Sequence, residues 1–292
     1  DFFLLMDRER VYELTGVQFL QFNSLYQLYA LKLHNPHRLE RTFSLLFMPD
    51  IFNYWLTGEK STEFTFATTS QLFNPLKMNW EEKLFEVIGV SPDIMNKVGF
   101  AGRVLGGIKA ELATELGLKA SIPVVLPASH DTASAVSAIP AHDENWAFIS
   151  SGTWSIMGIE LDKPFIDSFS LEKNFTNEGA WTGNFRFCKN ISGLWLLQEC
   201  CRIWSEKKTV SYETLVQKAD DAPPFRSLIN PDEPMFLKPE NMPSAIRSFC
   251  VSTGQPVPGS RGQIVRCILE SLALKYRCVL DELICVSEKP IE

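Results

Sequence analysis

Apolar residues in the first third of the chain recur every three or four positions, which is the spacing of a helix with one buried face. This pattern predicts helices within residues 6–33, 45–58, 79–90 and 108–118. Gly58 and Gly117 are natural helix stops, and Asn79 is a candidate cap for the third helix. Residues 61–75 are rich in Thr and Phe and end in Asn-Pro, so a strand or loop leading into a turn is predicted there.

Beyond residue 120 the pattern changes to that of strands. Residues 122–129 form a short continuous apolar run, which predicts a buried strand. Residues 145–161 alternate on either side of Ser151 and Gly152, which predicts a hairpin, and residues 183–190 alternate again.

Two further helices are predicted in the last hundred residues. One covers residues 193–208 after a cap at Ser192, and the other, longer and mostly apolar, covers residues 263–286. Residues 220–234 and 252–262 are predicted to be loops because they are rich in Pro and other turn-forming residues.

The segment GFAGRVLGG, residues 99–107, superficially resembles a phosphate-binding loop. No predicted strand precedes it, and no Gly-Lys-Ser/Thr closes it, so its spacing fits neither standard nucleotide fingerprint. It is therefore predicted to be a turn or connector.

The composition is that of a folded protein. A length of 292 residues is enough for two domains, and 45% hydrophobic residues exclude a disordered chain. The net charge of −7, from 35 acidic against 28 basic residues, argues against a surface that binds nucleic acid or an anionic membrane. No apolar run approaches the roughly 20 residues that a membrane span needs.

The seven cysteines are an odd number without CxxC spacing. This favours a reduced, cytoplasmic protein over a disulfide framework or a zinc site, and no metal ligands are predicted. Cys250 and Cys267 flank a Pro/Gly loop and are the pair that would bond if any did. The first residues lack both a cleavage-site pattern and an initiator Met, so we expect no signal peptide and a sequence that begins inside a longer protein.

Asp131 is the strongest candidate for chemistry, because it lies where the run 122–129 ends and a helix begins. Backbone N–H groups and the helix dipole would keep a carboxylate there ionised. An ionised Asp at the carboxyl end of a strand can accept a proton from an attacking hydroxyl. A simple helix cap would have the same sequence, and the small residues 133–135 fit either a nearby ligand or close packing.

Three other positions are candidate binding residues. In SSGTWS, residues 150–155, Gly152 would let the backbone approach a phosphate and Thr153 would add a hydroxyl, although a plain turn has the same composition. Asn190 ends a strand just before a helix, and Gln198 lies on that helix. The alternatives for these two are a turn residue and a solvated helix position.

Taken together, these segments resemble the FGGY family of carbohydrate kinases, and within it the branch that acts on L-rhamnulose. The pairing of SHDTASAV with SSGTWS is more particular to that branch than the Gly-x-Asp and Gly-Thr elements that the family shares. The matching segments follow family order across nearly the whole chain: residues 15–31, 45–58, 61–72, 124–136, 148–158 and 188–200.

The resemblance implies a fold of two ribonuclease-H-like α/β domains, as in actin and hexokinase, around a cleft. Residues 1–140 would form an N-terminal kinase domain on the sugar side. Residues 141–292 would form a C-terminal kinase domain on the nucleotide side. The implied protein is a cytoplasmic monomer or homodimer without nucleic-acid or membrane partners.

The resemblance also implies roles for individual residues. Asp131 would be the general base, and Thr153 with the Gly152 backbone would hold ATP phosphate, while Gln198 would line the nucleotide site. The residues implied to contact the sugar are His130, Asp131, Thr132 and Asn190. The implied reaction transfers the γ-phosphoryl group of ATP to O1 of L-rhamnulose with Mg²⁺, and such a reaction demands mainly positioning and charge neutralisation.

Two elements of the family are not found in this sequence. The family begins with a strand-turn-strand that carries an acidic residue and a Gly-rich phosphate turn, and it has a Gly-Gly-Gly adenine loop after the long C-terminal helix. Both domains are therefore expected to be partial, with the first one incomplete. The chain is expected to be a fragment that is weakly active or inactive by itself.

Two other functions stay open from the sequence. Another ketose kinase of the family, acting on fuculose or xylulose, is one, because a single methyl or hydroxyl group shifts specificity only modestly. A non-catalytic, sugar-binding relic of a kinase is the other. The presence of both Asp131 and Thr153 argues against a relic, which has no chemical need for either.

Overall fold

The computed structural model separates into two compact units, which we call unit 1 and unit 2. Unit 1 comprises Asp1–Glu144 and Ile159–Lys189, and unit 2 comprises Asn145–Gly158 and Asn190–Glu292. The structure describes residues 1–119, 122–141, 145–205, 210–287 and 290–291. Within these ranges no helix is both long enough and apolar enough to cross a membrane.

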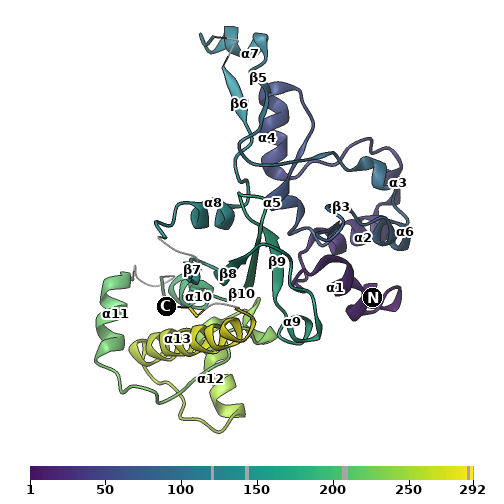
Figure 1. Cartoon of the computed structure of the whole chain (residues 1–292). Coiled ribbons are helices and arrows are strands. Elements are labelled where there is room, and N and C mark those ends of the chain that lie inside the picture. The colour runs from purple at the N-terminus through teal and green to yellow at the C-terminus, as the bar shows by residue number, and fades with distance from the viewer. Residues whose placement is uncertain (120–121, 142–144, 206–209, 288–289, 292) are drawn as a thin grey trace. The chain divides into compact units, whose positions relative to one another are not determined.

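Unit 1 mixes helices with short strands (Figure 1). Its helices are α1 Arg8–Thr15, α2 Ser24–His34, α3 Pro36–Glu40, α4 Met48–Thr57, α5 Phe64–Ala67, α6 Glu82–Ile88, α7 Ala110–Glu115, α8 Asp131–Ser137 and α9 Ser168–Glu172. Its strands are β1 Thr62–Glu63, β2 Phe73–Asn74, β3 Asn79–Trp80, β4 Val98–Gly99, β5 Val104–Gly107, β6 Pro123–Val125 and β9 Thr176–Gly179. Single 3₁₀ turns lie at Phe2–Leu4 and Pro92–Ile94.

The early helices end where the sequence predicts. Gly58 follows α4 in a left-handed conformation, with φ of 84°, and its N–H donates to the Tyr54 carbonyl. Gly16 ends α1 in the same way, so the helical periodicity of residues 6–33 is divided between two helices. Gly117 also has a positive φ just after α7.

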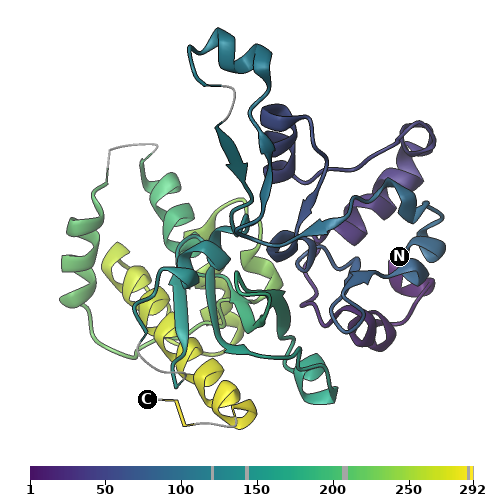
Figure 2. The same cartoon turned by 45° about the horizontal axis from the view of Figure 1, so that its top comes forward.

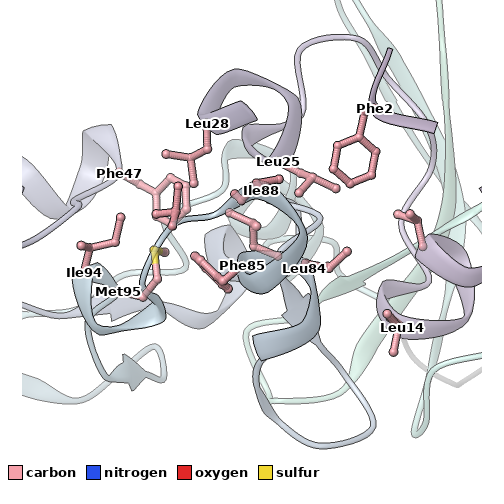
Figure 3. Close-up of a cluster of buried hydrophobic side chains, with 13 residues drawn as sticks. Phe2, Leu14, Leu25, Leu28, Phe47, Leu84, Phe85, Ile88, Ile94 and Met95 are labelled. Carbon is pink, nitrogen blue, oxygen red and sulfur yellow. The ribbon is translucent and has the colours of Figure 1, made fainter. Parts of the chain in front are cut away.

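The main core of unit 1 is a cluster of buried apolar side chains between α1, α2 and α6 (Figure 3). Leu25, Leu84 and Phe85 are completely buried, and burying each such side chain contributes roughly 1.5–3 kcal/mol. The 13 members of the cluster are Phe2, Val11, Leu14, Leu25, Leu28, Phe47, Leu72, Leu84, Phe85, Ile88, Val90, Ile94 and Met95. The apolar faces predicted from helical spacing therefore do meet in one core.

Two predictions for residues 99–129 are wrong. The segment 99–107 is not a plain connector, because β5 within it pairs antiparallel with β6. The run 122–129 is not a buried strand, because Pro123 and Val125 of β6 are exposed, and the buried residues Leu126 and Ala128 lie after the strand. Figure 2 shows this two-stranded ribbon ending at α7, and such a ribbon leaves part of its surface exposed. A continuous apolar run in the sequence does not tell whether both faces of a strand are covered.

Two local predictions in unit 1 also need correction. Asn79 does not cap α6, because it lies in β3 paired with Asn74, and Glu81 occupies the N-cap position. Residues 61–75 contain strands β1 and β2 as expected, but the short helix α5 lies between them. The Glu63 side chain caps α5 by accepting the Phe66 N–H, a signal hidden among Thr and Phe residues that favour strands.

One four-stranded sheet has the order β7-β8-β10-β9, with β7 Phe148–Ser151, β8 Ser155–Leu161 and β10 Phe185–Ile191. Strands β8 and β10 each contribute residues to both units. In unit 1, β9 and β10 pair antiparallel, and Arg186 of β10, opposite Glu178 of β9, is fully buried. Its guanidinium donates to the Glu178 carboxylate at 3.0 Å and to the Gly179 carbonyl at 3.1 Å, whereas its buried Nη1 atom has no hydrogen-bond partner among the described residues.

Unit 2 consists of the β7–β8 hairpin and a group of helices (Figure 1). The helices are α10 Trp195–Ser205, α11 Tyr212–Asp220, α12 Met242–Ser252 and α13 Arg261–Val286, with a 3₁₀ turn at Pro234–Phe236. The long helix α13 contacts α10 and α11, and α12 contacts α10. Ser260 caps α13 in a capping box with Gln263, so the predicted long terminal helix is confirmed.

The predicted hairpin is also confirmed, with Ser151 opposite Ser155 across the turn. The predicted cap at Ser192 is wrong, because α10 begins only at Trp195, three residues later. Positions 206–208 of the predicted helix lie outside the described residues.

All seven cysteines are free thiols, and five of them are buried. Cys250 and Cys267, the pair predicted to bond if any did, are both free and buried.

Asp50 on α4 generates a prediction about stability and pH. Its side chain is 1% exposed, and this burial, with the nearby Glu63 carboxylate, raises its pKa to about 7. The folded state therefore binds a proton more tightly than the unfolded chain, so folding stability falls as pH rises from about 4 to about 7. Replacing Asp50 with Asn should remove that loss. The change that the substitution causes in the free energy of unfolding should therefore be about 2 kcal/mol more stabilising at pH 8 than at pH 5.

Urea unfolding of the wild type and Asp50→Asn at pH 5 and pH 8 measures this difference. Glu81→Gln is the matched control. Burial raises the pKa of the Glu81 carboxyl, but the hydrogen bonds from Lys77 and Asn74 lower it more, so its pKa is lowered where that of Asp50 is raised. The same dependence on pH in Asp50→Asn and the wild type would contradict the prediction.

Gly193 generates a second prediction, about the turn of the hairpin. A Cβ at this position would lie 2.7 Å from the Ser155 nitrogen and 2.8 Å from the Gly152 carbonyl oxygen. Gly193→Ala should therefore displace the turn and cost about 1–3 kcal/mol of stability. Thermal unfolding and the amide resonances of Leu194 and Trp195 report it; Gly106→Ala, with no neighbour closer than 3.7 Å, is the control. Equal melting temperatures for the two variants would count against this account.

Candidate active site

In unit 1, the predicted sugar-contacting residues lie together at the start of α8. His130 occupies the N-cap position, and its Nδ1 atom accepts the Thr132 N–H at 3.3 Å. Asp131 is thus the first residue of the helix rather than its cap. Its Oδ1 atom accepts the same Thr132 N–H at 2.7 Å. The two side chains therefore accept from the same Thr132 N–H, which holds them beside each other.

The Asp131 carboxylate is ionised and open. Its side chain is 97% exposed, whereas that of His130 is 18% exposed. The His130 ring, whose Nδ1 atom lies 3.2 Å from Asp131 Oδ1, lowers the Asp131 pKa to about 2, assisted by the Thr132 N–H. A carboxylate with this pKa is charged throughout the physiological range and is free to accept a hydrogen bond from a ligand.

The His130 ring can serve its neighbours in two ways. Its Nδ1 atom is 3.2 Å from Asp131 Oδ1 and 3.3 Å from the Thr132 nitrogen. An unprotonated Nδ1 accepts from Thr132, whereas a protonated Nδ1 donates to Asp131. The position of one proton therefore changes how strongly Asp131 is held.

The backbone before Asp131 is attached to buried residues of unit 1. The Ser129 N–H donates to Glu63 Oε2, and the His130 N–H donates to Thr65 Oγ1, each at 3.1 Å. The Thr65 hydroxyl in turn donates to the same Glu63 oxygen. Phe66 lies against His130, with ring centroids 6.0 Å apart. Glu63 and Thr65 were not among the residues predicted from the sequence, although Glu63 is an acid within an otherwise uncharged Thr/Phe stretch, which was a usable signal.

In unit 2, two residues predicted to contact ATP are hydrogen-bonded to each other. The Thr153 hydroxyl donates to Gln198 Oε1 at 3.0 Å. The Gly152 N–H donates to the Trp154 carbonyl at 2.8 Å, so the turn itself uses an amide that was predicted to face phosphate. Thr153 is exposed at the tip of this turn.

The turn is joined to the first residues of α10. The Leu194 and Trp195 N–H groups donate to the Gly152 and Thr153 carbonyls at 2.9 and 3.0 Å. These are amides that a helix start leaves without partners inside the helix. The carbonyls of the hairpin turn thus accept from amides at the start of α10, and the same bonds hold the turn in place.

Asn190 is half-buried near the end of β10. Two residues later, the Ser192 N–H donates to Asp232 Oδ1 at 2.9 Å, and Lys275 forms a 2.8 Å ion pair with the other oxygen of Asp232. Ser155, completely buried, shares a 2.6 Å hydrogen bond with Tyr276 on α13. The long helix therefore supports both the turn and the segment after Asn190.

The structure brings the predicted residues together as two groups. His130, Asp131 and Thr132 form one group within unit 1, and Thr153 with Gln198 forms another within unit 2. That the two groups face each other across a cleft stays a prediction. No set of three or more His, Cys, Asp or Glu side chains in the described part of the chain could hold a metal ion.

Family models match the chain in two consecutive parts. The model for the FGGY family of carbohydrate kinases, N-terminal domain, matches residues 4–137. The model for the C-terminal domain of the same family matches residues 147–292.

Curated relatives match almost the whole chain. A rhamnulokinase from Bacteroides thetaiotaomicron is 47% identical over 291 residues, covering 100% of this chain and 59% of the relative. Rhamnulokinases from Pectobacterium atrosepticum and Halalkalibacterium halodurans are 44% and 40% identical, covering 95% and 97% of this chain. The chain therefore spans between half and three fifths of the length of these relatives.

Solved structures share the fold at lower identity. A xylulose kinase from Lactobacillus acidophilus superposes with a TM-score of 0.74 at 17% identity, covering 97% of this chain and 57% of that one. A gluconate kinase from the same organism gives a TM-score of 0.75, also at 17% identity and with the same coverage. The predicted α/β fold with two kinase domains is confirmed, and the chain belongs to the FGGY family of carbohydrate kinases.

Proposed function

We propose that this chain is the part of an ATP-dependent sugar kinase that phosphorylates L-rhamnulose at O1 and yields L-rhamnulose 1-phosphate. The observation that carries the proposal is the exposed, ionised Asp131 beside His130 and Thr132, in a chain 47% identical to a rhamnulokinase. Identity at that level over the whole chain favours the same substrate over fuculose or xylulose. The xylulose and gluconate kinases are similar only in fold, at 17% identity.

The proposed reaction needs one proton acceptor and a fixed sugar. The O1 hydroxyl oxygen attacks the γ-phosphorus of ATP, the bond from that phosphorus to the β–γ bridging oxygen breaks, and ADP leaves. The hydroxyl proton passes to an Asp131 carboxylate oxygen. With a pKa of about 2, Asp131 is a weak base, which suits a loose transition state in which the hydroxyl loses its proton late.

Neighbouring residues would orient the sugar. We assign His130 and Thr132 to sugar hydroxyls beside Asp131, and Asn190 to a further hydroxyl. Thr132 is buried and held near the helix start, whereas His130 is partly exposed and has a second ring nitrogen available for a ligand. This set can both accept and donate hydrogen bonds, as a polyhydroxylated ketose requires.

The nucleotide would bind at unit 2. We assign the exposed Thr153 hydroxyl to a phosphate oxygen, and Gln198 to the nucleotide site. The hydroxyl has one hydrogen, so its bond to Gln198 Oε1 would open to let it donate to phosphate, or Gln198 would turn and donate its amide N–H to the Thr153 oxygen. ATP would bring Mg²⁺, which in such sites is held largely by phosphate oxygens and water with few carboxylates. That division of ligands fits a described region without a three-residue metal cluster.

The domain roles and the setting follow from the same proposal. We propose residues 1–140 as the sugar-side domain and residues 141–292 as the nucleotide-side domain. ATP and a reducing environment for seven free thiols are both found in the cytoplasm.

Asp131→Asn generates the first test. The isosteric amide keeps the bonds to Thr132 and cannot take the proton, so turnover should fall by about 100-fold or more, with the sugar affinity changed less than threefold. Because the chain spans 59% of its Bacteroides relative, the assay uses a chimaera that joins the unmatched parts of that relative to this chain. A coupled ADP-release assay reports turnover, and calorimetry reports sugar binding.

Asp162→Asn is the matched control, since it makes the same change at another exposed carboxylate of unit 1. The proposal fails if the wild-type chimaera phosphorylates xylulose as fast as L-rhamnulose, or if Asp131→Asn retains full turnover.

The hydrogen bond from His130 generates a second test. Because His130 is the largest cause of the low Asp131 pKa, His130→Ala should raise that pKa toward its usual range near 4. The carboxyl ¹³C resonance of Asp131 measures this by titration from pH 2.5 upward. The wild-type resonance should stay flat between pH 4 and pH 8, and a midpoint within that interval would refute the assignment.

A further inference from the structure

Glu63 is a completely buried acidic side chain that the assigned sugar and nucleotide contacts do not include. It lies at the junction of β1 and α5, where its Oε2 atom accepts hydrogen bonds from three donors. These donors are the Thr65 hydroxyl, the Phe66 N–H and the Ser129 N–H. A buried carboxylate is costly unless it is well hydrogen-bonded, so a position that keeps one needs a reason.

Two of the bonds lead to the segment that carries Asp131. Ser129 donates its N–H directly to Glu63, and His130 donates its N–H to Thr65, whose hydroxyl is held by Glu63. Consecutive amides, 66 and 65 residues away in sequence from their acceptors, therefore depend on one carboxylate. The next residue is Asp131.

The other end of this connection is closely packed. Helix α5 is attached to β9 by the Gly179 N–H, which donates to Thr68 Oγ1 at 2.7 Å. The Phe64 ring packs so closely on Gly179 that a Cβ there would lie 2.6 Å from it. Glu63 also donates its own N–H to Asp50 of α4 at 3.1 Å. Glu63 thus connects a closely packed part of unit 1 to the segment 129–132, in which the Asp131 side chain is exposed.

We propose that Glu63 is a positioning residue for the sugar-binding segment 129–132, acting through the Ser129 amide directly and the His130 amide by way of Thr65. It sets where the His130 ring and the Asp131 carboxylate stand, without touching the sugar. The assignment of a sugar to this segment rests on the proposed function, whereas the hydrogen bonds do not.

The charge of Glu63 is the feature to change. Hydrogen bonds to a charged acceptor are about twice as strong as neutral ones. In Glu63→Gln the amide oxygen can replace Oε2, and the amide nitrogen would replace Oε1, which has no donor among the described residues. The variant keeps the volume and weakens the bonds to Ser129 and Thr65, so it isolates positioning from packing.

The test measures binding and local structure on the 292-residue chain itself. Calorimetry with L-rhamnulose gives the affinity, and the ¹H shifts of the Ser129 and His130 amides report their hydrogen bonds. Glu63→Gln and Thr65→Val should each weaken sugar binding about 10-fold, as expected for loss of charge-assisted bonds. Both should move the two amide resonances upfield. Thr65→Ser, which restores the hydroxyl, should return affinity to within threefold of the wild type.

Glu81→Gln is the matched control, because Glu81 is also a buried carboxylate of unit 1, held by Asn74 and Lys77 away from this segment. It should lower stability while leaving both amide resonances in place and affinity within twofold. A Glu63→Gln affinity within twofold of the wild type, or equal losses in Glu63→Gln and Glu81→Gln, would overturn the proposal.

A wild-type chain that does not bind L-rhamnulose would count against the proposed function. The amide resonances would then test the positioning role of Glu63 by themselves. Unmoved Ser129 and His130 resonances in Glu63→Gln would then overturn the positioning role, and shifted ones would support it.

Discussion

The hydrogen bond from the Ser129 N–H to the buried Glu63 carboxylate is the interaction on which the account depends most. A catalytic carboxylate must be open to its substrate and yet hold one position, and an exposed side chain has few contacts of its own to hold it. In this chain Asp131, the proposed proton acceptor, is held through its backbone, because the amides of residues 129 and 130 donate to the buried residues Glu63 and Thr65. The His130 ring and the Thr132 amide then complete the placement of Asp131.

Unit 2 meets a similar requirement with backbone atoms. The hairpin turn and the start of α10 satisfy each other, as two helix amides donate to the Gly152 and Thr153 carbonyls. Gly193 permits this close approach because it has no side chain to meet Ser155. The exposed Thr153 hydroxyl is in this way presented by a turn that a helix of 11 residues supports. Both groups of residues are thus held by local contacts within their own unit.

Sequence reasoning found the elements whose signals are local. Gly58 ends a helix because glycine readily adopts the left-handed conformation, a property of that residue alone. The β7–β8 hairpin follows from the alternation of residues on either side of a short turn. It also found His130, Asp131 and Thr132 together, since they are adjacent in the chain. It failed for β6, because an apolar run does not tell whether one or two faces of a strand are covered.

The other failures depended on partners distant in sequence. Ser192 does not cap α10 because the helix begins only at Trp195, where the Leu194 and Trp195 amides donate to carbonyls of the distant hairpin turn. Glu63 stood in the quoted family segment, yet nothing local shows that its carboxylate receives an amide from residue 129. The bond between Thr153 and Gln198 likewise spans 45 residues. Composition and periodicity carry no information on such pairs.

The central claim is that Asp131 meets the hydroxyl that becomes phosphorylated. A crystal structure of the chain with L-rhamnulose bound tests it most directly. The account predicts the sugar O1 atom within hydrogen-bonding distance, about 2.5–3.0 Å, of an Asp131 carboxylate oxygen, with His130 on a neighbouring hydroxyl. A sugar bound elsewhere, or bound with O1 out of reach of Asp131, would contradict it.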